Sequence, residues 1–384
     1  MTYKGGLVDL KRRKTVNRRK FLKGSVTLGI TALVQRILGG TGTPAQAADG
    51  RKTPEPPAVL DRVVAGDLDH HIYLPLISRQ LPLAHGPSKL GLHTINSNKA
   101  TKFVQDVHGG GAHVALVKAL GEFGYLRDVK AISPETVTVA RWNGRPAVDP
   151  SGDPAQKAAD MLYGSNGHME HWKYEKDVVD YWEILNENDP LSIEGHVWLA
   201  QFFIAAMDIA ETNGYKLALF SYSVGVPQWH EWEAIVETGV FVRAKEGGHI
   251  LALHEYGWPT TDARWGEATE DMPPYEDRGV WTGRYRYLYR DFLIPRDEVI
   301  PLAITESGFD PSIIRTGWDD WKPRYVENMI WYDTKLREDD YVIGATLFTI
   351  GPIGIWRDWD YEELLWPNTY GSNFLDYIIS LKDA

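Results

Sequence analysis

The sequence contains no cysteine in its 384 residues. Without cysteine the chain forms no disulfide bond and offers no thiolate to a metal ion, which excludes a disulfide scaffold and a cysteine zinc site. It also lacks a long hydrophobic run near its start, because the apolar stretch at 24–34 is about half the length that a membrane-spanning helix needs. We therefore expect no membrane span in the protein that follows this stretch.

Positive charge is scarce over most of the chain. Residues 1–47 contain ten basic residues and one acid, a net charge of +9, whereas residues 48–384 contain 31 basic and 51 acidic residues, a net charge of −20. A strongly acidic protein repels phosphate backbones, so we expect no nucleic-acid partner. The same charge makes a neutral ligand more attractive than a polyanionic one.

The basic N-terminal segment, 1–47, resembles an export signal. Its basic part precedes the apolar stretch, and small residues at Ala45 and Ala47 follow, so we expect cleavage after Ala47. The sequence RRKFLK at 18–23 is similar to the twin-arginine signals of bacteria. A Sec-type signal or an uncleaved anchor stays open as an alternative. The segment predicts a secreted, periplasmic or otherwise extracytoplasmic bacterial protein.

The rest of the chain reads as one folded unit. A proline-rich stretch, TPEPP at 53–57, predicts an extended linker over 48–58. No second linker and no internal repeat follows, so we expect a single domain over 59–384, and a monomer. About 320 residues is an ordinary size for a barrel with insertions.

Apolar runs bounded by turn residues alternate with segments of helical character along this unit. The predicted strands are 89–94, 112–117, 136–141, 178–185, 216–221, 249–254, 299–305 and 341–348. The predicted helices are 99–107, 122–132, 154–163, 196–213, 229–246, 282–292 and 318–338. Eight strands separated by helices imply parallel strands with right-handed crossovers, so the sequence predicts an α/β fold, a (β/α)8 TIM barrel.

An open doubly wound sheet is the main competing fold. Its phosphate-binding version needs a G-x-G-x-x-G turn after the first strand, and 92–96 reads LHTIN. The glycine run at 109–111 precedes the second strand and is typical of a turn. The barrel is therefore favoured.

Two glutamates follow apolar strands at the ends where barrel enzymes carry their chemistry. Asn186 and Glu187 come after the fourth predicted strand, and Glu306 comes directly after the seventh. Cleavage of a glycosidic bond requires one carboxylic acid to protonate the leaving oxygen and a second carboxylate on the other side of the sugar. Glu187 and Glu306 are therefore candidate catalytic residues, with ordinary loop acids or helix caps as the alternative reading.

These residues resemble the clan of retaining glycoside hydrolases with (β/α)8 barrels, often called clan A. The resemblance covers about 89–348 and implies that Glu187 is the acid/base, Glu306 the nucleophile and Asn186 a ligand of the substrate's 2-hydroxyl. The segment HEYGWP at 254–259 looks like the end of the sixth strand in this clan, which implies that His254 or Tyr256 contacts the nucleophile.

The sequence also departs from the clan's pattern at two strand ends. Lys118 stands where an arginine is frequent after the second strand, and Phe348-Thr349 stands where a tryptophan usually ends the eighth. These departures bear more on which sugar binds at the cleavage site than on which reaction takes place there.

Further substrate contacts are expected from strand ends and from tryptophans, whose flat rings suit the stacking of sugars. Each of these residues could equally serve as a core or ion-pair residue. The candidates are His93, Arg141, Trp142, Trp258, Trp265 and Trp356.

The expected partner is a carbohydrate, an oligosaccharide or polysaccharide, and neither a cofactor nor a catalytic metal is expected. Twelve histidines are present, but no H-E-x-x-H motif occurs. Two other functions stay open, an exported barrel that binds carbohydrate without catalysis and a metal-dependent hydrolase on the same fold. A separation near 5 Å between the two carboxyl groups favours the retaining enzyme.

Overall fold

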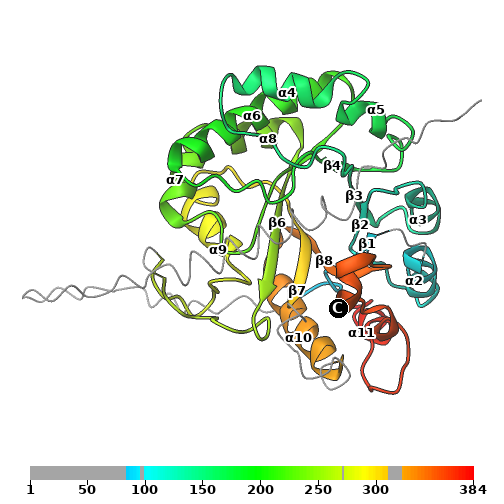
Figure 1. The fold of residues 1–384 in the computed structure, drawn as a ribbon. Helices are drawn as coiled ribbons and strands as arrows, with labels where there is room; N and C mark the ends of the chain where they lie inside the picture. The colour runs from blue at the N-terminus through cyan, green and yellow to red at the C-terminus, as the bar shows by residue number, and fades with distance from the viewer. Residues whose placement is uncertain (1–83, 96–98, 270–271, 310–321) are drawn as a thin grey trace, which may run out of the picture.

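Eight parallel strands close into a barrel in the computed structural model, which describes residues 84–95, 99–269, 272–309 and 322–384. Each strand pairs with the next one along the chain, and β8 pairs with β1. This order confirms the (β/α)8 TIM barrel (Figure 1). The strands are β1 (Leu90–Ile95), β2 (Leu116–Leu120), β3 (Val137–Arg141), β4 (Tyr181–Glu183), β5 (Leu217–Tyr222), β6 (Ile250–Gly257), β7 (Leu302–Phe309) and β8 (Val342–Ile350).

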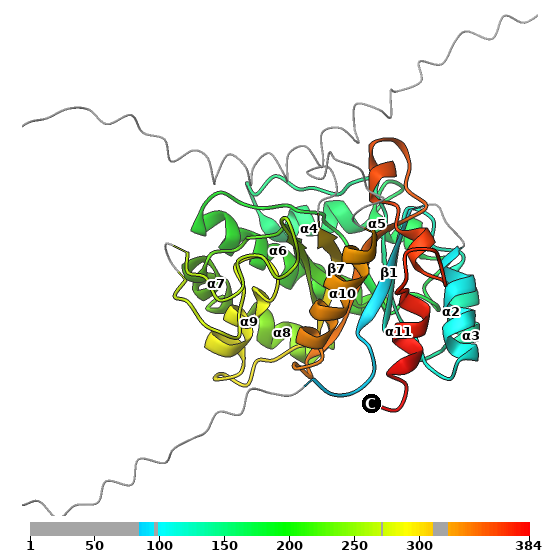
Figure 2. The same cartoon turned by 90° about the horizontal axis from the view of Figure 1, so that it is seen from below.

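Helices surround the strands on the outside of the barrel (Figures 1 and 2). The helix at Phe374–Ser380 contacts the one at Lys99–Gly109, and Trp366, which precedes the former, donates from Nε1 to Asp106 of the latter at 2.7 Å. The helices are α2 (Lys99–Gly109), α3 (Leu126–Ile132), α4 (Pro154–Leu162), α5 (His168–Trp172), α6 (Ile193–Thr212), α7 (Trp229–Val236), α8 (Val240–Gly247), α9 (Tyr285–Leu288), α10 (Lys322–Leu336) and α11 (Phe374–Ser380). Shorter helical turns span Tyr289–Leu293, Gly354–Trp359 and Glu362–Leu364.

The predicted export signal, 1–47, and the predicted linker, 48–58, lie outside the described residues, so both stay predictions. Among the residues that the structure does describe, no helix combines the length and the hydrophobicity that a membrane span requires.

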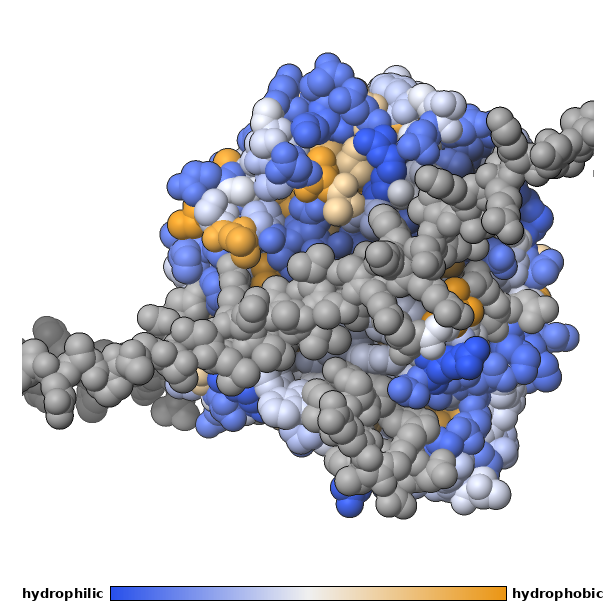
Figure 3. All heavy atoms as spheres, viewed as in Figure 1, coloured by the Kyte–Doolittle hydropathy of each residue, from blue (hydrophilic) through white to orange (hydrophobic). Residues whose placement is uncertain are grey.

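Hydrophilic side chains dominate the described part of the face shown in Figure 3, with small hydrophobic patches between them. The most exposed large hydrophobic residues, Leu191 and Tyr174, stand on different loops. Scattered exposed residues of this kind are normal on a protein surface.

Several boundaries differ from those predicted. The second strand begins at Leu116, because the apolar run at 112–115 is buried as a loop, and Lys118 therefore lies inside β2. The predicted helix at 229–246 is two helices, α7 and α8, because Gly239 adopts a left-handed φ of 78° between them. The fourth strand is limited to β4, since an apolar run does not by itself distinguish a strand from a buried loop.

Inward side chains of the barrel form an apolar layer with a charged layer above it. The apolar layer consists of Leu116, Val139, Ala218, Ile250, Ala252 and Ala303, all buried and all supplied by strands. Side chains two positions apart share one side of a strand. Lys118, Arg141 and His254 therefore follow Leu116, Val139 and Ala252 toward the C-terminal ends of β2, β3 and β6. This end is the one that carries active sites in TIM barrels.

An extra residue in β7 turns Glu306 toward the same layer. Leu253 and His254 are consecutive in β6, but they pair with Ile304 and Glu306 of β7, so Thr305 is a bulge. Without the bulge, Glu306 would lie an odd number of residues from inward-facing Ala303 on the opposite side of the strand. The bulge restores an inward direction to Glu306.

A buried arginine ties α9 to the end of α10. Arg286 is fully buried and contacts Asp339 at 2.6 Å and Glu338 at 2.9 Å, and it donates to the carbonyl oxygens of Asp277 and Lys335, each at 2.6 Å. Every one of these groups loses a charged partner if the guanidinium is removed. The network therefore holds this part of the helical ring to the barrel.

Arg286→Met is expected to lower the free energy of unfolding by about 3 kcal/mol, because buried Asp339 loses its closest cationic partner and two backbone carbonyls lose their donor. Urea unfolding followed by circular dichroism measures this loss. Arg296→Met is the matched control, since Arg296 pairs with Glu237 on the surface and such pairs contribute about 1 kcal/mol or less. Equal losses in the two variants would show that the buried network adds no stability.

Candidate active site

Glu187 and Glu306 reach the same end of the barrel from different elements. Glu306 belongs to β7, whereas Glu187 lies in the loop after β4. The backbone of Glu187 has a left-handed φ of 48°, and its N–H donates to the carbonyl of Ser221 at 2.9 Å. Residues other than glycine seldom adopt this conformation, and those that do are concentrated at functional sites. The loop therefore holds Glu187 in one direction.

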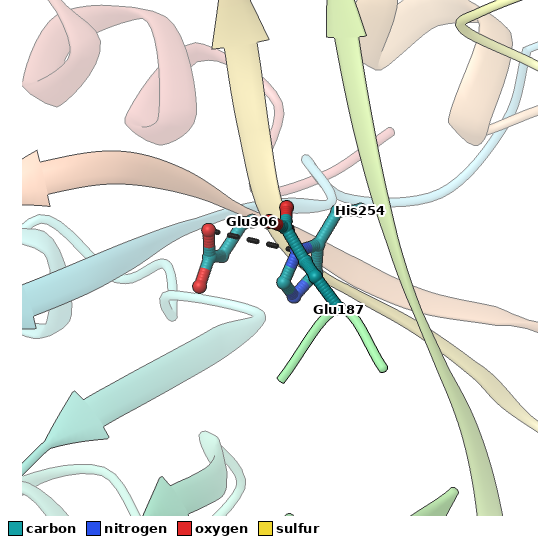
Figure 4. Close-up of side chains that lie close together, drawn as sticks. All are labelled: Glu187, His254 and Glu306. Carbon is teal, nitrogen blue, oxygen red and sulfur yellow. Dashed lines mark hydrogen bonds and ion pairs between the residues drawn. The ribbon is translucent and has the colours of Figure 1, made fainter. Parts of the chain in front are cut away.

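His254 lies between the two glutamates, as Figure 4 shows. Its Nδ1 is 3.0 Å from Oε1 of Glu187 and 3.6 Å from Oε2 of Glu306. Nδ1 therefore lies within hydrogen-bonding distance of Glu187, and the tautomer of the ring decides which of the two atoms donates. One oxygen of Glu187, one oxygen of Glu306 and a ring nitrogen of His254 all lie within 4.8 Å of one another. The structure thus brings together the three residues that the sequence placed on three separate segments.

The two oxygens of Glu306 have different surroundings. Oε1 faces two cationic side chains, with Lys118 Nζ at 3.4 Å and Arg141 Nη2 at 3.5 Å, and the ring of His93, with Nε2 at 3.8 Å. Oε2 accepts a hydrogen bond from the Tyr256 hydroxyl at 3.1 Å. This carboxylate is 7% exposed. Contacts therefore hold the carboxylate through both of its oxygens, and a small part of Glu306 remains exposed.

Charge keeps Glu306 ionised. Burial on its own raises the pKa of Glu306, but His254, Lys118 and Arg141 together lower that pKa well below its ordinary value. A buried carboxylate that stays ionised at neutral pH can act as a nucleophile or as an electrostatic stabiliser.

Lys118 and Glu183 form a buried ion pair that the sequence did not reveal. Lys118 Nζ lies 2.8 Å from Oε2 of Glu183, and both side chains are fully buried. Arg141 Nη1 lies 3.7 Å from the same oxygen. Burial alone raises the pKa of Glu183, but Lys118 and Arg141 lower it below its ordinary value. The available signal was two charged residues inside apolar strands, where an unpaired charge is costly.

The other predicted strand-end residues also reach the site. Arg141 donates from Nη1 to Oδ1 of Asn186, which connects the cationic cluster with the predicted ligand of the 2-hydroxyl. His93 is fully buried, and its Nδ1 lies 2.7 Å from Oγ1 of Thr349. Burial lowers the pKa of His93 well below its usual value, so the ring is neutral. Thr349 thus orients His93 beside Glu306.

The tryptophans predicted to stack on sugars differ in their exposure. Trp258 follows β6 directly, is 49% exposed and contacts the ring of Trp281, with ring centroids 6.3 Å apart, and its stacking on a sugar stays a prediction. Trp356 is mostly buried and packs on Phe348 and Trp359, both of which also contact Tyr256. Trp356 therefore packs against the two aromatic residues that support the Tyr256 ring.

The structure does not bring Trp265 or Trp142 into the cluster of carboxylates. Trp265 packs against Trp331 of α10 and donates from Nε1 to the carbonyl of Glu276 at 2.8 Å. Trp142 stacks on His171 of α5 with ring centroids 3.7 Å apart. Both residues are half-buried, because the segments that carry them pack on side chains of the outer helices.

A metal ion could find three donors at this site, since Glu187, His254 and Glu306 each offer one atom within 4.8 Å of the others. The donor chemistry fits proton transfer better. Nδ1 of His254 already lies within hydrogen-bonding distance of Glu187, and Lys118 and Arg141 already supply positive charge beside Glu306.

Tyr256→Phe is expected to lower kcat/KM on a substrate of this site by about 10-fold or more, because a hydrogen bond to a charged group is worth about 1.5 to 3 kcal/mol. Steady-state kinetics measures the loss. Tyr361→Phe is the control, since the Tyr361 hydroxyl donates to the carbonyl of Leu347 at 2.8 Å and not to a carboxylate. An equal loss in both variants would show that Tyr256 only supports the fold.

Comparison with protein-family models and with curated proteins gives no match. Solved structures similar to this chain include an endo-β-1,4-glucanase from Xanthomonas axonopodis pv. citri with three substitutions, at 13% identity, covering 77% of this chain and 99% of that one, with a TM-score of 0.43. An endo-β-1,4-mannanase from Thermotoga petrophila has 11% identity, 77% coverage of each chain and a TM-score of 0.43. The protein BuGH86, bound to neoagarooctaose, has 12% identity, covers 79% of this chain and 62% of its own, and has a TM-score of 0.47. One barrel carries many activities, so the reaction has to follow from the side chains of this chain.

Proposed function

We propose that this protein is an exported glycoside hydrolase that cleaves O-glycosidic bonds of a β-linked glycan with retention of configuration. The observation that carries the proposal is the close approach of two carboxylates, with one oxygen of Glu187 within 4.8 Å of one oxygen of Glu306. Carboxyl groups about 5 to 5.5 Å apart are typical of retaining enzymes, whereas inverting enzymes need roughly 6.5 to 9.5 Å to admit a water.

In the first half of the reaction Glu306 attacks the anomeric carbon and Glu187 donates a proton to the departing oxygen. The sugar then forms an ester with Glu306. In the second half Glu187, now ionised, takes a proton from water, the water oxygen bonds to the anomeric carbon, and Glu306 leaves as a carboxylate. The lowered pKa of Glu306 supports its assignment as the group that is ionised at the start.

The surrounding residues support this division of roles. Tyr256 and His254 contact Oε2 of Glu306. These contacts restrict the direction from which Glu306 can attack the sugar. Arg141 orients Asn186, the residue expected to hold the 2-hydroxyl, where a hydrogen bond that strengthens in the transition state is useful. A barrel that only binds carbohydrate has no need of a carboxylate kept ionised among three basic side chains.

Export and the choice of glycan rest on the sequence. The basic, apolar and small-residue segments of 1–47 support export, and N-terminal sequencing of protein recovered outside the cytoplasm tests cleavage after Ala47. The net charge of −20 over 48–384 supports a neutral glycan in preference to a polyanion.

The proposal is tested by a screen of neutral β-linked polysaccharides in which new reducing ends are detected. Proton NMR during the first turnovers then shows whether the released anomer keeps the β configuration. Glu306→Gln protein, purified in the same way, controls for contaminating activity. Release of the inverted anomer would overturn the retaining mechanism, and the absence of new reducing ends from every glycan would overturn the hydrolase.

A further inference from the structure

We propose that Lys118 is a positioning residue for the second half of the reaction, in which it assists the departure of Glu306 from the glycosyl-enzyme. This inference rests on the proposed function. It concerns a side chain whose cationic end contacts the two carboxylates of Glu183 and Glu306.

The geometry shows that Glu183 is the closer partner of Lys118. The Nζ atom is 2.8 Å from Oε2 of Glu183 and 3.4 Å from Oε1 of Glu306. Lys118 comes from β2 and Glu183 from β4, and both side chains are fully buried in the barrel. The ammonium group is therefore held in place by Glu183 even when Glu306 loses its charge.

The charge balance of this cluster changes during the reaction. Lys118 and Arg141 carry two positive charges, and Glu183 and Glu306 carry two negative ones. When Glu306 becomes an ester its negative charge disappears, while Glu187 becomes ionised on the other side of the sugar. Lys118, Arg141 and Glu183 then carry one unbalanced positive charge beside the ester. In a buried site such a charge favours any step that restores the carboxylate.

Hydrolysis of the ester is that step. A proton passes from water to Glu187, the water oxygen bonds to the anomeric carbon, and the bond from that carbon to the Glu306 oxygen breaks. The electron pair of the broken bond stays on Glu306, whose regained negative charge is shared by both carboxylate oxygens, and Oε1 of this carboxylate lies 3.4 Å from Lys118 Nζ. Lys118 thus stabilises the negative charge where it develops.

Lys118 is a cleaner probe of this effect than Arg141. Arg141 also donates to Asn186, so its removal disturbs the expected contact with the 2-hydroxyl. The ionisable or charged groups that face Glu306 from all neighbouring elements are His93, Lys118, Arg141, Glu183, Glu187, His254 and Tyr256. Of these, Lys118 and Glu183 form a pair that can be changed one member at a time.

The experiment uses the full-length protein and an aryl β-glycoside with an activated leaving group, which makes the first half of the reaction fast. Lys118→Met is expected to lower kcat at least about 10-fold and to lower KM by a similar factor, so that kcat/KM changes little. A burst of released phenol equal to the amount of enzyme is expected, because the ester accumulates. Lys118→Arg keeps the positive charge and is expected to restore most of kcat.

Two further variants keep the test decisive. If Lys118→Met does not fold because Glu183 is left buried, the double variant Lys118→Met with Glu183→Gln removes both charges and is expected to show the same burst. The acidic limb of kcat/KM is expected to move to higher pH in Lys118→Met and not in Glu183→Gln, because only the first removes a cation from beside Glu306. A purely structural role would move both variants in the same direction.

The outcomes separate this inference from the proposed function. Wild-type hydrolysis, together with a Lys118→Met variant that loses kcat and kcat/KM equally and shows no burst, overturns the role of Lys118 and leaves the hydrolase intact. A wild-type protein that cleaves no aryl β-glycoside and no glycan overturns both. A burst that Lys118→Arg abolishes supports the inference.

Discussion

Glu306→Gln is expected to lower kcat/KM on a β-linked substrate by at least about three orders of magnitude, while the protein still folds. The amide of Gln carries no negative charge and cannot form the glycosyl ester, so the first half of the reaction is blocked. Gln nearly matches Glu in shape, and its amide oxygen can still accept from Tyr256 or Lys118, the present partners of the carboxylate. Steady-state kinetics on an activated aryl β-glycoside measures the loss, and circular dichroism checks the fold.

Glu246→Gln provides the matched control for this substitution. Glu246 is exposed on α8, so the same chemical change there is expected to leave kcat/KM unaltered. Full activity of Glu306→Gln on any glycoside would remove Glu306 from the reaction. Because the loss of either carboxylate reduces activity, this variant alone does not distinguish the nucleophile from the acid.

Glu187→Ala is expected to separate the two roles through its dependence on the leaving group. With a poorly acidic leaving group, loss of the general acid is expected to lower kcat/KM by about 10²- to 10⁴-fold. With a strongly acidic phenol the departing oxygen needs no proton, so much of kcat/KM is expected to survive. Comparison of two aryl glycosides whose phenols differ widely in pKa measures this difference directly.

Asp189→Asn is the control for this prediction. Asp189 lies two residues after Glu187, and burial raises the pKa of Asp189 to about 6. Its Oδ1 accepts a hydrogen bond from the backbone N–H of Ser223 at 3.2 Å, so this carboxylate holds a loop. We expect its replacement to affect both substrates by the same factor. If Glu187→Ala also slows both substrates equally, Glu187 does not protonate the leaving group.

The barrel and the location of its two glutamates could be predicted from the sequence. Each apolar run is followed by a helical segment, so the alternation depends on local composition, which a sequence carries in full. Glu187 and Glu306 could be singled out because both follow such runs, and the ends of strands meet at one face of a parallel barrel. The registers of the strands were not needed for either inference.

The direction in which each side chain of the site points was decided by the tertiary structure. The bulge at Thr305 turns Glu306 inward, and it exists only as a mismatch between β6 and β7. Pairing of Lys118 with Glu183 likewise joins β2 to β4, and a charged residue inside an apolar strand does not by itself reveal which partner it meets. The sequence by itself determined the eight strands and singled out Glu187 and Glu306 as candidates, because hydrophobic periodicity is local. Only the closed sheet decided where each side chain points and which charge it meets, because register and burial depend on segments far apart in the chain.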